Sequence, residues 1–176
     1  MLKSGTHMWA LDELIATYPD IGIIQTHRDP VKVATSFSSL STLVRSMASD
    51  EVDAGVVGAD WTPRLAKVLE RSIDVRLARG DADARFHDVH FRDLLADPMA
   101  VVERIYAHYD IELEGRAVDA MRAFIAANPA GKHGAHRYAP EEYGLDPGTE
   151  RARFARYTEY FGIEAEEQSA VADRVA

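Results

Sequence analysis

The stretch "IIQTHRDPVKVATSFSSL", residues 23–40, predicts a strand, a tight turn and a helix in direct succession. Residues 21–27 are apolar and rich in β-branched side chains, as is typical of a short buried strand. Asp29 suits the N-cap of the following helix, and Pro30 suits its first position. The apolar residues that come next recur at helical spacing and mark one face of that helix: Val33, Ala34, Phe37, Leu40 and Val44.

The rest of the chain repeats this alternation of helices and strands. The spacing of apolar residues predicts a helix over 7–18, a long helix that ends at Gly80, a strand over 84–91, and helices near Pro98, over 115–128 and from 149 onward. Because parallel strands need long crossover connections, strands joined by helices indicate an α/β fold with a parallel sheet. Two strands are few for such a sheet, so we expect it to be incomplete.

The length and the composition indicate one domain. A chain of 176 residues with 47% hydrophobic content can bury a core of ordinary size, so we expect a single domain over residues 1–176. Two segments are polar and contain glycine, and they predict long loops at 49–59 and 128–148.

The charge and the cysteine content exclude several classes of protein. The net charge is −9, and residues 139–176 carry four basic and nine acidic groups, so we expect no binding to nucleic acid or to anionic membranes. The chain has no apolar run of membrane-spanning length and no signal-peptide pattern at Met1. The absence of cysteine excludes disulfides and agrees with a cytoplasmic protein.

Arg28 stands where α/β proteins commonly bind anions. Ligands of open α/β sheets lie beyond the carboxyl ends of the strands, and a helix that begins there offers free N–H groups to an anion. The guanidinium of Arg28 can hold a phosphate with two hydrogen bonds, and Ser36, two turns into the helix, can add a hydroxyl. The alternative is that Arg28 forms a salt bridge with an acidic residue and that Ser36 only lines the helix.

Three segments resemble one known family. The segment "LKSGTHMWALDELIATYPDIGIIQTHRDPVKVATSFSSL" is similar to the part of sulfotransferases that binds the 3′-phosphate of 3′-phosphoadenosine 5′-phosphosulfate (PAPS), where an arginine after a strand precedes a helical serine by eight residues. Arg28 and Ser36 match that pattern. "FHDVHFRDLLADPMAVVERIYAHYDIEL" resembles a later strand and helix, and "NPAGKHGAHRYAPEEYGLD" resembles the loop of the bacterial branch that closes over the nucleotide.

The resemblance implies a fold and an activity. The implied fold is the sulfotransferase fold, which is related to that of P-loop NTPases, and the implied reaction is sulfuryl transfer from PAPS to a hydroxyl or amine. The family's glycine-rich loop for the 5′-phosphosulfate has no match in this sequence. We therefore expect the chain to correspond to the C-terminal part of the family fold, and to be weak or inactive as an enzyme by itself.

The resemblance also assigns two candidate catalytic residues. Lys3 lies in "LKS", where the family has a lysine that reaches the transferring group and the leaving phosphate; the alternative is a solvated lysine near a chain end. His7 is a candidate base for the acceptor proton, although it lies two positions away from the histidine of the "KTH" branch. The alternative is that His7 caps or packs at the start of the first helix.

The loop near residue 132 completes the candidate site. Lys132 and Arg137 are the expected nucleotide contacts, since glycine-containing loops with cations can wrap a phosphate. His133 and His136 are a poor ligand set for a metal, and we expect no metal.

Two main functions, and a weaker third one, remain open from the sequence. The first is a PAPS-dependent sulfotransferase that acts on a small-molecule or glycan acceptor. The second is a noncatalytic remnant of the fold that binds nucleotide or a partner, and a nucleoside-kinase relative is a third, weaker reading because the glycine-lysine loop is absent. An incomplete sheet further predicts association, either as a homodimer or with a missing N-terminal segment.

Overall fold

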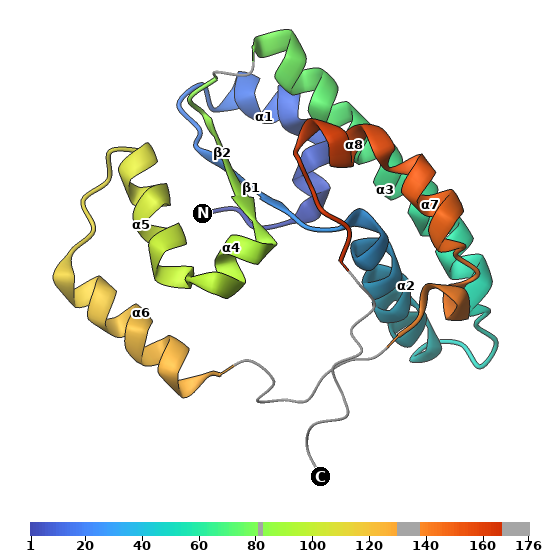
Figure 1. Cartoon of the computed structure of the whole chain (residues 1–176). Helices are drawn as coiled ribbons and strands as arrows, with labels where there is room; N and C mark the ends of the chain where they lie inside the picture. The colour runs from blue at the N-terminus through green and yellow to red at the C-terminus, as the bar shows by residue number, and fades with distance from the viewer. Residues whose placement is uncertain (81–82, 130–137, 167–176) are drawn as a thin grey trace. The chain divides into compact units, whose positions relative to one another are not determined.

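The computed structural model describes residues 1–80, 83–129 and 138–166. Its two strands lie among helical elements that follow one another along the chain (Figure 1). In chain order the elements are η1 (Gly5–Ala10), α1 (Leu11–Thr17), β1 (Ile23–His27), α2 (Pro30–Ser46), α3 (Ala54–Arg79), β2 (Phe86–His90), α4 (Phe91–Ala96), α5 (Pro98–His108), α6 (Gly115–Ala127), η2 (Pro140–Tyr143), α7 (Pro147–Arg153) and α8 (Ala155–Tyr160).

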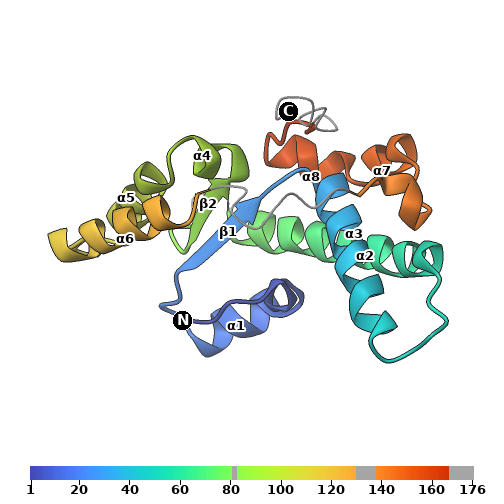
Figure 2. The same cartoon turned by 90° about the horizontal axis from the view of Figure 1, so that it is seen from below.

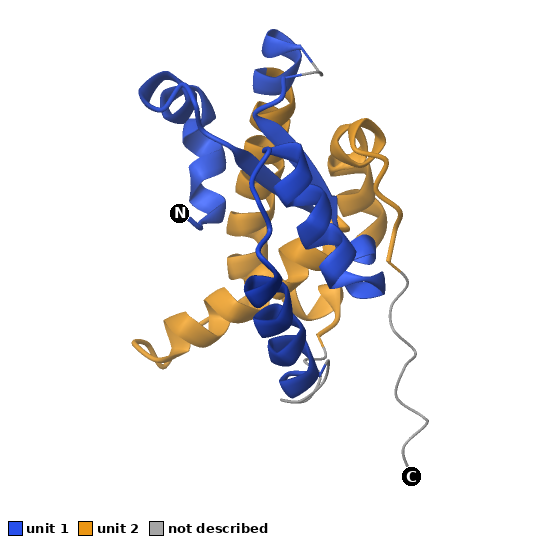
Figure 3. Cartoon of the chain, turned by 90° about the vertical axis from the view of Figure 1, so that its left-hand side faces the viewer, with its two compact units in different colours: residues 1–27, 75–137 blue, residues 28–74, 138–176 orange. Residues whose placement is uncertain are grey.

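The chain divides into two compact units (Figure 3). Unit 1 contains residues 1–27 and 75–137, and unit 2 contains residues 28–74 and 138–176. The first boundary falls directly after β1, between His27 and Arg28. The end of the strand therefore belongs to one unit, and the helix that follows it belongs to the other.

Unit 1 contains the parallel sheet. β1 and β2 pair in parallel from Ile23 opposite Phe86 to His27 opposite His90, as the sequence predicts. α4 and α5 pack against β2, and α6 packs against α5 (Figure 2). One apolar cluster of this unit consists of Leu11, Ile15, Val75 and Phe86, with Ile21 and Ile23 packed against it. Val89, Met99 and Val101 of the same unit are buried as well.

The side chains of β1 differ from the predicted buried strand. Burial alternates along β1: Gln25 and His27 are buried, whereas Ile24 is exposed. The buried positions are polar because Arg76 of α3 and Asp88 of β2 provide hydrogen-bond partners for them. A polar network therefore occupies the positions where the sequence predicts an apolar strand interior.

Unit 2 is helical. η2 and α7 pack against α2, and α8 follows α7 directly (Figure 1). Gly58 of α3 lies so close to η2 that a Cβ at this position would stand 2.1 Å from the carbonyl oxygen of Tyr143. The buried hydrophobic residues of this unit are Val31, Ala34, Val57, Val68, Leu69, Ile73, Tyr143, Leu145, Phe154, Tyr157 and Phe161.

The start of α2 agrees with the sequence, but its buried face does not. Asp29 is the N-cap and Pro30 is the first helical residue, as expected. The buried side of α2 consists of Pro30, Val31, Ala34, Thr35 and Ser38, whereas Phe37, Leu40 and Val44 of the predicted apolar face are exposed. Small side chains on the buried side leave room for η2 and α7 to approach the helix.

The segments expected to be loops are shorter than predicted. α3 begins at Ala54, inside the segment 49–59, and the carboxylate of Asp53 accepts a hydrogen bond from the N–H of Val56 near that helix start. Within 128–148, residues 140–143 form η2 and α7 begins at Pro147. Asp146 caps α7 by accepting a hydrogen bond from the N–H of Thr149.

Candidate functional site

Arg28 lies between the end of β1 and the start of α2, as the sequence predicts. Its guanidinium holds the carboxylate of Glu166 with two hydrogen bonds: Nε donates to Oε1 and Nη2 donates to Oε2, each at 2.8 Å. This is the geometry with which arginine binds a planar or tetrahedral anion. The residue expected to bind a phosphate thus holds an anionic group in this structure.

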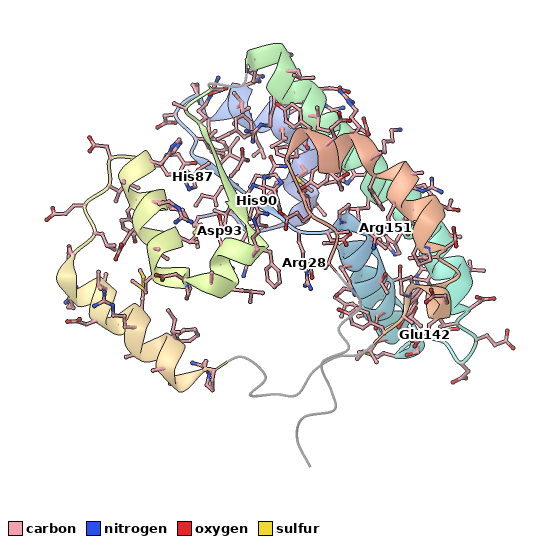
Figure 4. All side chains as sticks on the ribbon, in the orientation of Figure 1. Arg28, His87, His90, Asp93, Glu142 and Arg151 are labelled. Carbon is pink, nitrogen blue, oxygen red and sulfur yellow. The ribbon has the colours of Figure 1, made fainter. Side chains whose placement is uncertain are left out.

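Asp29 fixes the backbone on both sides of this contact. Its Oδ1 accepts a hydrogen bond from the N–H of Val31 at 2.9 Å, which caps α2, and its Oδ2 accepts one from the N–H of Glu166 at 2.8 Å. Nη1 of Arg151 in α7 lies 3.9 Å from the same Oδ2. Figure 4 labels Arg28 at the start of α2 and Arg151 on α7. Asp29 is buried and serves as a structural residue, in agreement with the sequence interpretation.

The electrostatics of the contact favour the ionised form of both partners. The hydrogen bonds from Arg28 lower the pKa of Glu166, and the positive charge of Lys32 in the first turn of α2 lowers it further. The hydrogen bonds to Glu166 raise the pKa of Arg28. Arg28 and Lys32 thus create a positive potential at the start of a long helix, where the helix dipole also favours an anion.

Sequence reasoning missed Glu166 and Lys32 at this place. Glu166 is 138 positions away from Arg28, and no spacing rule connects residues so far apart. The excess of acidic groups in residues 139–176 was the single signal that an anion from this region could pair with a cation elsewhere. Lys32 follows Arg28 by four positions, which is a recognisable pattern for two cations near a helix start.

Of the predicted site residues that the structure describes, Ser36 belongs to the same unit as Arg28, whereas Lys3 and His7 belong to unit 1. Ser36 is partly buried in α2. Lys3 and His7 belong to unit 1, where the exposed Lys3 precedes η1 and the backbone N–H of His7 donates to the carbonyl of Ser4. His7 therefore lies within η1. The candidates Lys132 and Arg137 lie outside the described residues.

A second cluster of charged and polar side chains lies in unit 1, and it includes His27, the residue directly before Arg28. Nε2 of His27 lies 2.9 Å from Oδ1 of Asp88, and Arg76 donates to both carboxylate oxygens of Asp88 at 2.8 and 2.7 Å. Nη1 of Arg76 also lies 3.4 Å from Oε1 of Gln25. Because an ionised carboxylate can only accept hydrogen bonds, Nε2 of His27 carries a proton. The cluster joins β1 and β2 to α3.

The pKa values in this cluster are shifted by burial and by hydrogen bonds. Burial lowers the pKa of His27, because the charged ring would lose its hydration, and the hydrogen bond to Asp88 only partly opposes this effect. Burial alone would raise the pKa of Asp88, but the hydrogen bonds from His27 and Arg76 outweigh it and lower that pKa. The cluster therefore contains an ionised Asp88, a charged Arg76 and a neutral His27.

Two kinds of feature are absent from the part of the chain that the structure describes. Within residues 1–80, 83–129 and 138–166, no three histidine, aspartate or glutamate side chains are grouped so that they could hold a metal ion. Over the same ranges, no helix combines the length and the apolar character that are needed to cross a membrane.

The chain is similar to known proteins in both sequence and structure. The sequence model of the sulfotransferase family matches residues 1–115. The chain belongs to the sulfotransferase family. Sulfotransferase STF9 from Mycobacterium avium has a similar structure, with a TM-score of 0.83 and 29% sequence identity over 94% of this chain. Sulfotransferase STF1 from Mycobacterium tuberculosis H37Rv is similar with a TM-score of 0.69 and 34% identity over 88% of this chain. Among curated proteins, none matches.

The chain spans about two fifths of the length of these sulfotransferase structures. It covers 42% of the Mycobacterium avium protein and 39% of the Mycobacterium tuberculosis protein. The fold predicted from the sequence is confirmed: it is a sulfotransferase fold of the α/β class, and the described residues contribute two parallel strands and many helices to it.

Proposed function

We propose that this chain acts in sulfuryl transfer from PAPS to a hydroxyl or amine group of a small-molecule or glycan acceptor. Membership of the sulfotransferase family supports the reaction class. The observation that carries the proposal is the bidentate hold of Arg28 on a carboxylate at the start of α2. A guanidinium that holds a carboxylate in this way can hold a phosphate oxygen pair by the same two donors.

The 3′-phosphate of the nucleotide takes the place of that carboxylate in our proposal. Arg28 binds two of its oxygens, and Lys32 adds a positive charge from the first turn of α2. Ser36 donates its hydroxyl from further along the same helix. Lys132 and Arg137, which precede η2 in the sequence, contact the nucleotide in this proposal. No metal takes part, since the negative charge of the donor is balanced by these cations.

The reaction is an in-line displacement at sulfur. The acceptor oxygen or nitrogen forms a new bond to sulfur while the bond from sulfur to the bridging phosphate oxygen breaks. Adenosine 3′,5′-bisphosphate leaves with the electron pair of that bond, and the acceptor proton passes to a base, for which His7 is the candidate within this chain. Lys3 offsets the negative charge that develops on the leaving phosphate. The reaction needs no covalent enzyme intermediate.

A second function is a noncatalytic nucleotide-binding module. It is favoured by the division of the chain, because Arg28, Ser36 and Glu166 all belong to unit 2, whereas Lys3 and His7 belong to unit 1. The residues proposed to bind the 3′-phosphate itself, Arg28, Lys32 and Ser36, all belong to unit 2. In both functions we propose the same phosphate site, and they differ in whether sulfuryl transfer accompanies binding.

The phosphate site is tested by the preference between two nucleotides. Adenosine 3′,5′-bisphosphate should bind more tightly than AMP in isothermal titration, with the ligand at millimolar concentration. Arg28→Ala should remove this preference and weaken binding of the bisphosphate by about tenfold to a hundredfold, as expected for loss of a charge-assisted hydrogen-bonded pair. Equal binding of both nucleotides by the unaltered chain would contradict the assignment.

A charge-matched variant controls for a general loss of positive charge. Arg45, near the end of α2, pairs with Asp60 and is exposed. Arg45→Ala removes the same charge from the same helix and should leave the preference for the bisphosphate unchanged. If Arg45→Ala and Arg28→Ala have equal effects, then the preference reflects net charge rather than a site.

A further inference from the structure

The carboxylate that Arg28 holds comes from the chain itself, from the segment that follows α8. After α8 ends at Tyr160, the chain returns to the start of α2, where Glu166 meets Arg28 (Figure 1). Two links hold Glu166 there: its carboxylate accepts from Arg28, and its backbone N–H donates to Asp29. The side chain and the backbone of one residue are thus both fixed at the proposed phosphate site.

The exposure of this ion pair distinguishes it from a structural one. The two carboxylates are similarly exposed, Glu166 to 33% and Asp88 to 31%, but the Arg28 side chain is 39% exposed whereas the Arg76 side chain is only 8% exposed. Ion pairs that water can reach contribute little to stability, so they exchange partners at low cost. Arg76 cannot give up Asp88 in the same way, because its buried charge would remain in the interior without a partner.

The carboxylate of Asp29 keeps two of its interactions when Glu166 moves away. Its Oδ1 continues to cap α2 through the N–H of Val31, and Arg151 remains 3.9 Å from its Oδ2. Departure of Glu166 therefore leaves the start of α2 intact. The contact can open without loss of the helix that carries the phosphate site.

We infer that Glu166 is a built-in competitor that occupies the phosphate site until the nucleotide displaces it. This inference rests on the proposed function of Arg28. A phosphate monoester carries more negative charge than a carboxylate at neutral pH, so it is the stronger ligand for Arg28 and Lys32. Both anions cannot share one guanidinium fork, because each would repel the other. Binding of the nucleotide and binding of the Glu166 carboxylate to Arg28 are then coupled, and each weakens the other to the same extent.

Removal of the competing charge tests this coupling. Glu166→Gln keeps the size of the side chain but cannot form the charged pair with Arg28. Adenosine 3′,5′-bisphosphate should then bind about fivefold to tenfold more tightly in isothermal titration, while AMP, which lacks the 3′-phosphate, should bind as before. Glu159→Gln removes the same charge from an exposed position in α8 and should leave both affinities unchanged.

A label next to Glu166 reports its release directly. The chain has no cysteine, so Ala165→Cys provides a single attachment point for a spin label, and Ala165 is exposed. Adenosine 3′,5′-bisphosphate should increase the mobility of the label, and AMP at equal occupancy should not. In the background of Glu166→Gln the label should be more mobile than in the unaltered chain before any nucleotide is added, because only the backbone link to Asp29 remains.

The outcomes separate this inference from the proposed function. If Arg28→Ala removes the nucleotide preference but Glu166→Gln leaves the affinity for the bisphosphate unchanged, Glu166 does not compete and the inference is overturned, although the phosphate site stands. If neither the unaltered chain nor Glu166→Gln prefers the bisphosphate to AMP, the phosphate site itself is wrong, and the inference is overturned with it. Tighter binding of the bisphosphate by Glu166→Gln, together with increased mobility of the label, supports both the phosphate site and the competition by Glu166.

Discussion

The Nε2 atom of His27, the last residue of β1, lies 2.9 Å from Oδ1 of Asp88, the middle residue of β2. Asp88 also holds both terminal nitrogens of Arg76, so one carboxylate joins β1, β2 and α3. His27 is the residue directly before Arg28 in the sequence. The end of β1, which Arg28 follows directly, is therefore fixed by a cluster of charged and polar side chains.

Asp88→Asn should destabilise the protein by about 3 kcal/mol, since it leaves the buried charge of Arg76 without a counter-charge. We place the value at the low end for buried pairs because the Asp88 side chain is 31% exposed. The free energy of unfolding can be measured by urea unfolding followed by circular dichroism. Asp12→Asn is the matched control, since Asp12 pairs with Arg79 at an exposed position of the same unit and should cost less than about 1 kcal/mol. Equal effects of the two variants would contradict the structural role of Asp88.

The stability of the fold should fall as the pH drops below about 6.5, the ordinary pKa of histidine. Burial lowers the pKa of His27 in the folded chain, so between that lowered pKa and 6.5 the unfolded chain binds more protons than the folded chain. Stability then rises with pH across this window and is fully present above it. His87 contributes in the same direction, because burial lowers its pKa too.

His27→Asn tests the origin of this pH dependence. The difference in urea midpoint between pH 7.5 and pH 5.5 should become smaller in the variant, although His87 should preserve part of it. The comparison concerns the pH dependence rather than the absolute stability, which the variant lowers in any case. An unchanged pH dependence in His27→Asn would exclude His27 as its source.

Gly58→Ala should destabilise unit 2 by about 1–2 kcal/mol. The new Cβ would stand 2.1 Å from the carbonyl oxygen of Tyr143, so the backbone of α3 or η2 must move, and the helix preference of alanine offsets only part of that cost. Gly148→Ala in α7 is the control, because its nearest neighbour is a side-chain oxygen of Asp146 at 3.4 Å. Urea unfolding should show a loss for the first variant and no loss for the second. A neutral Gly58→Ala would show that α3 and η2 are not in close contact.

The protein should associate in a concentration-dependent manner. Within the described residues the sheet has two strands, so each strand has one edge without a strand neighbour, and such edges promote pairing between chains. Ile24, which is exposed on β1, should add to this tendency. Sedimentation measurements should show that Ile24→Lys shifts the distribution toward monomer, since a charge on an edge strand opposes pairing. A stable monomer at all concentrations would argue against association through the sheet.

Residues 1–176 alone should show little or no transfer of labelled sulfuryl from PAPS to phenol, sugar or amine acceptors. Sulfuryl transfer requires cations already positioned at the leaving phosphate, and Lys3 is the residue proposed for this role. Addition of the glycine-rich segment of a longer relative should restore activity, and Lys3→Ala should then reduce the rate by about a hundredfold. Lys67→Ala, at an exposed position in α3, should have no such effect. Turnover by the 176 residues alone would overturn this expectation and make His7 the next residue to replace.

The sequence by itself determined the local elements around the site, because local signals depend on neighbouring residues. Asp29 and Pro30 start α2 through a cap and a preset backbone angle, and both signals lie within three residues of the helix start. The same holds for Gly80, which has a positive φ of 88° directly after the end of α3. The resemblance to the sulfotransferase family likewise rests on contiguous segments of sequence. The family match over residues 1–115 confirms that resemblance.

Only the tertiary structure decided which charges meet and which apolar side chains are covered. Glu166 pairs with Arg28 across 138 positions, and His27 pairs with Asp88 across 61, so no local spacing could reveal either contact. Likewise, the predicted apolar face of α2 was wrong about burial, since packing against η2 and α7 selects the side with small residues and leaves Leu40 and Val44 exposed. Periodicity shows that a helix has an apolar face, but the partners that cover a face come from distant parts of the chain.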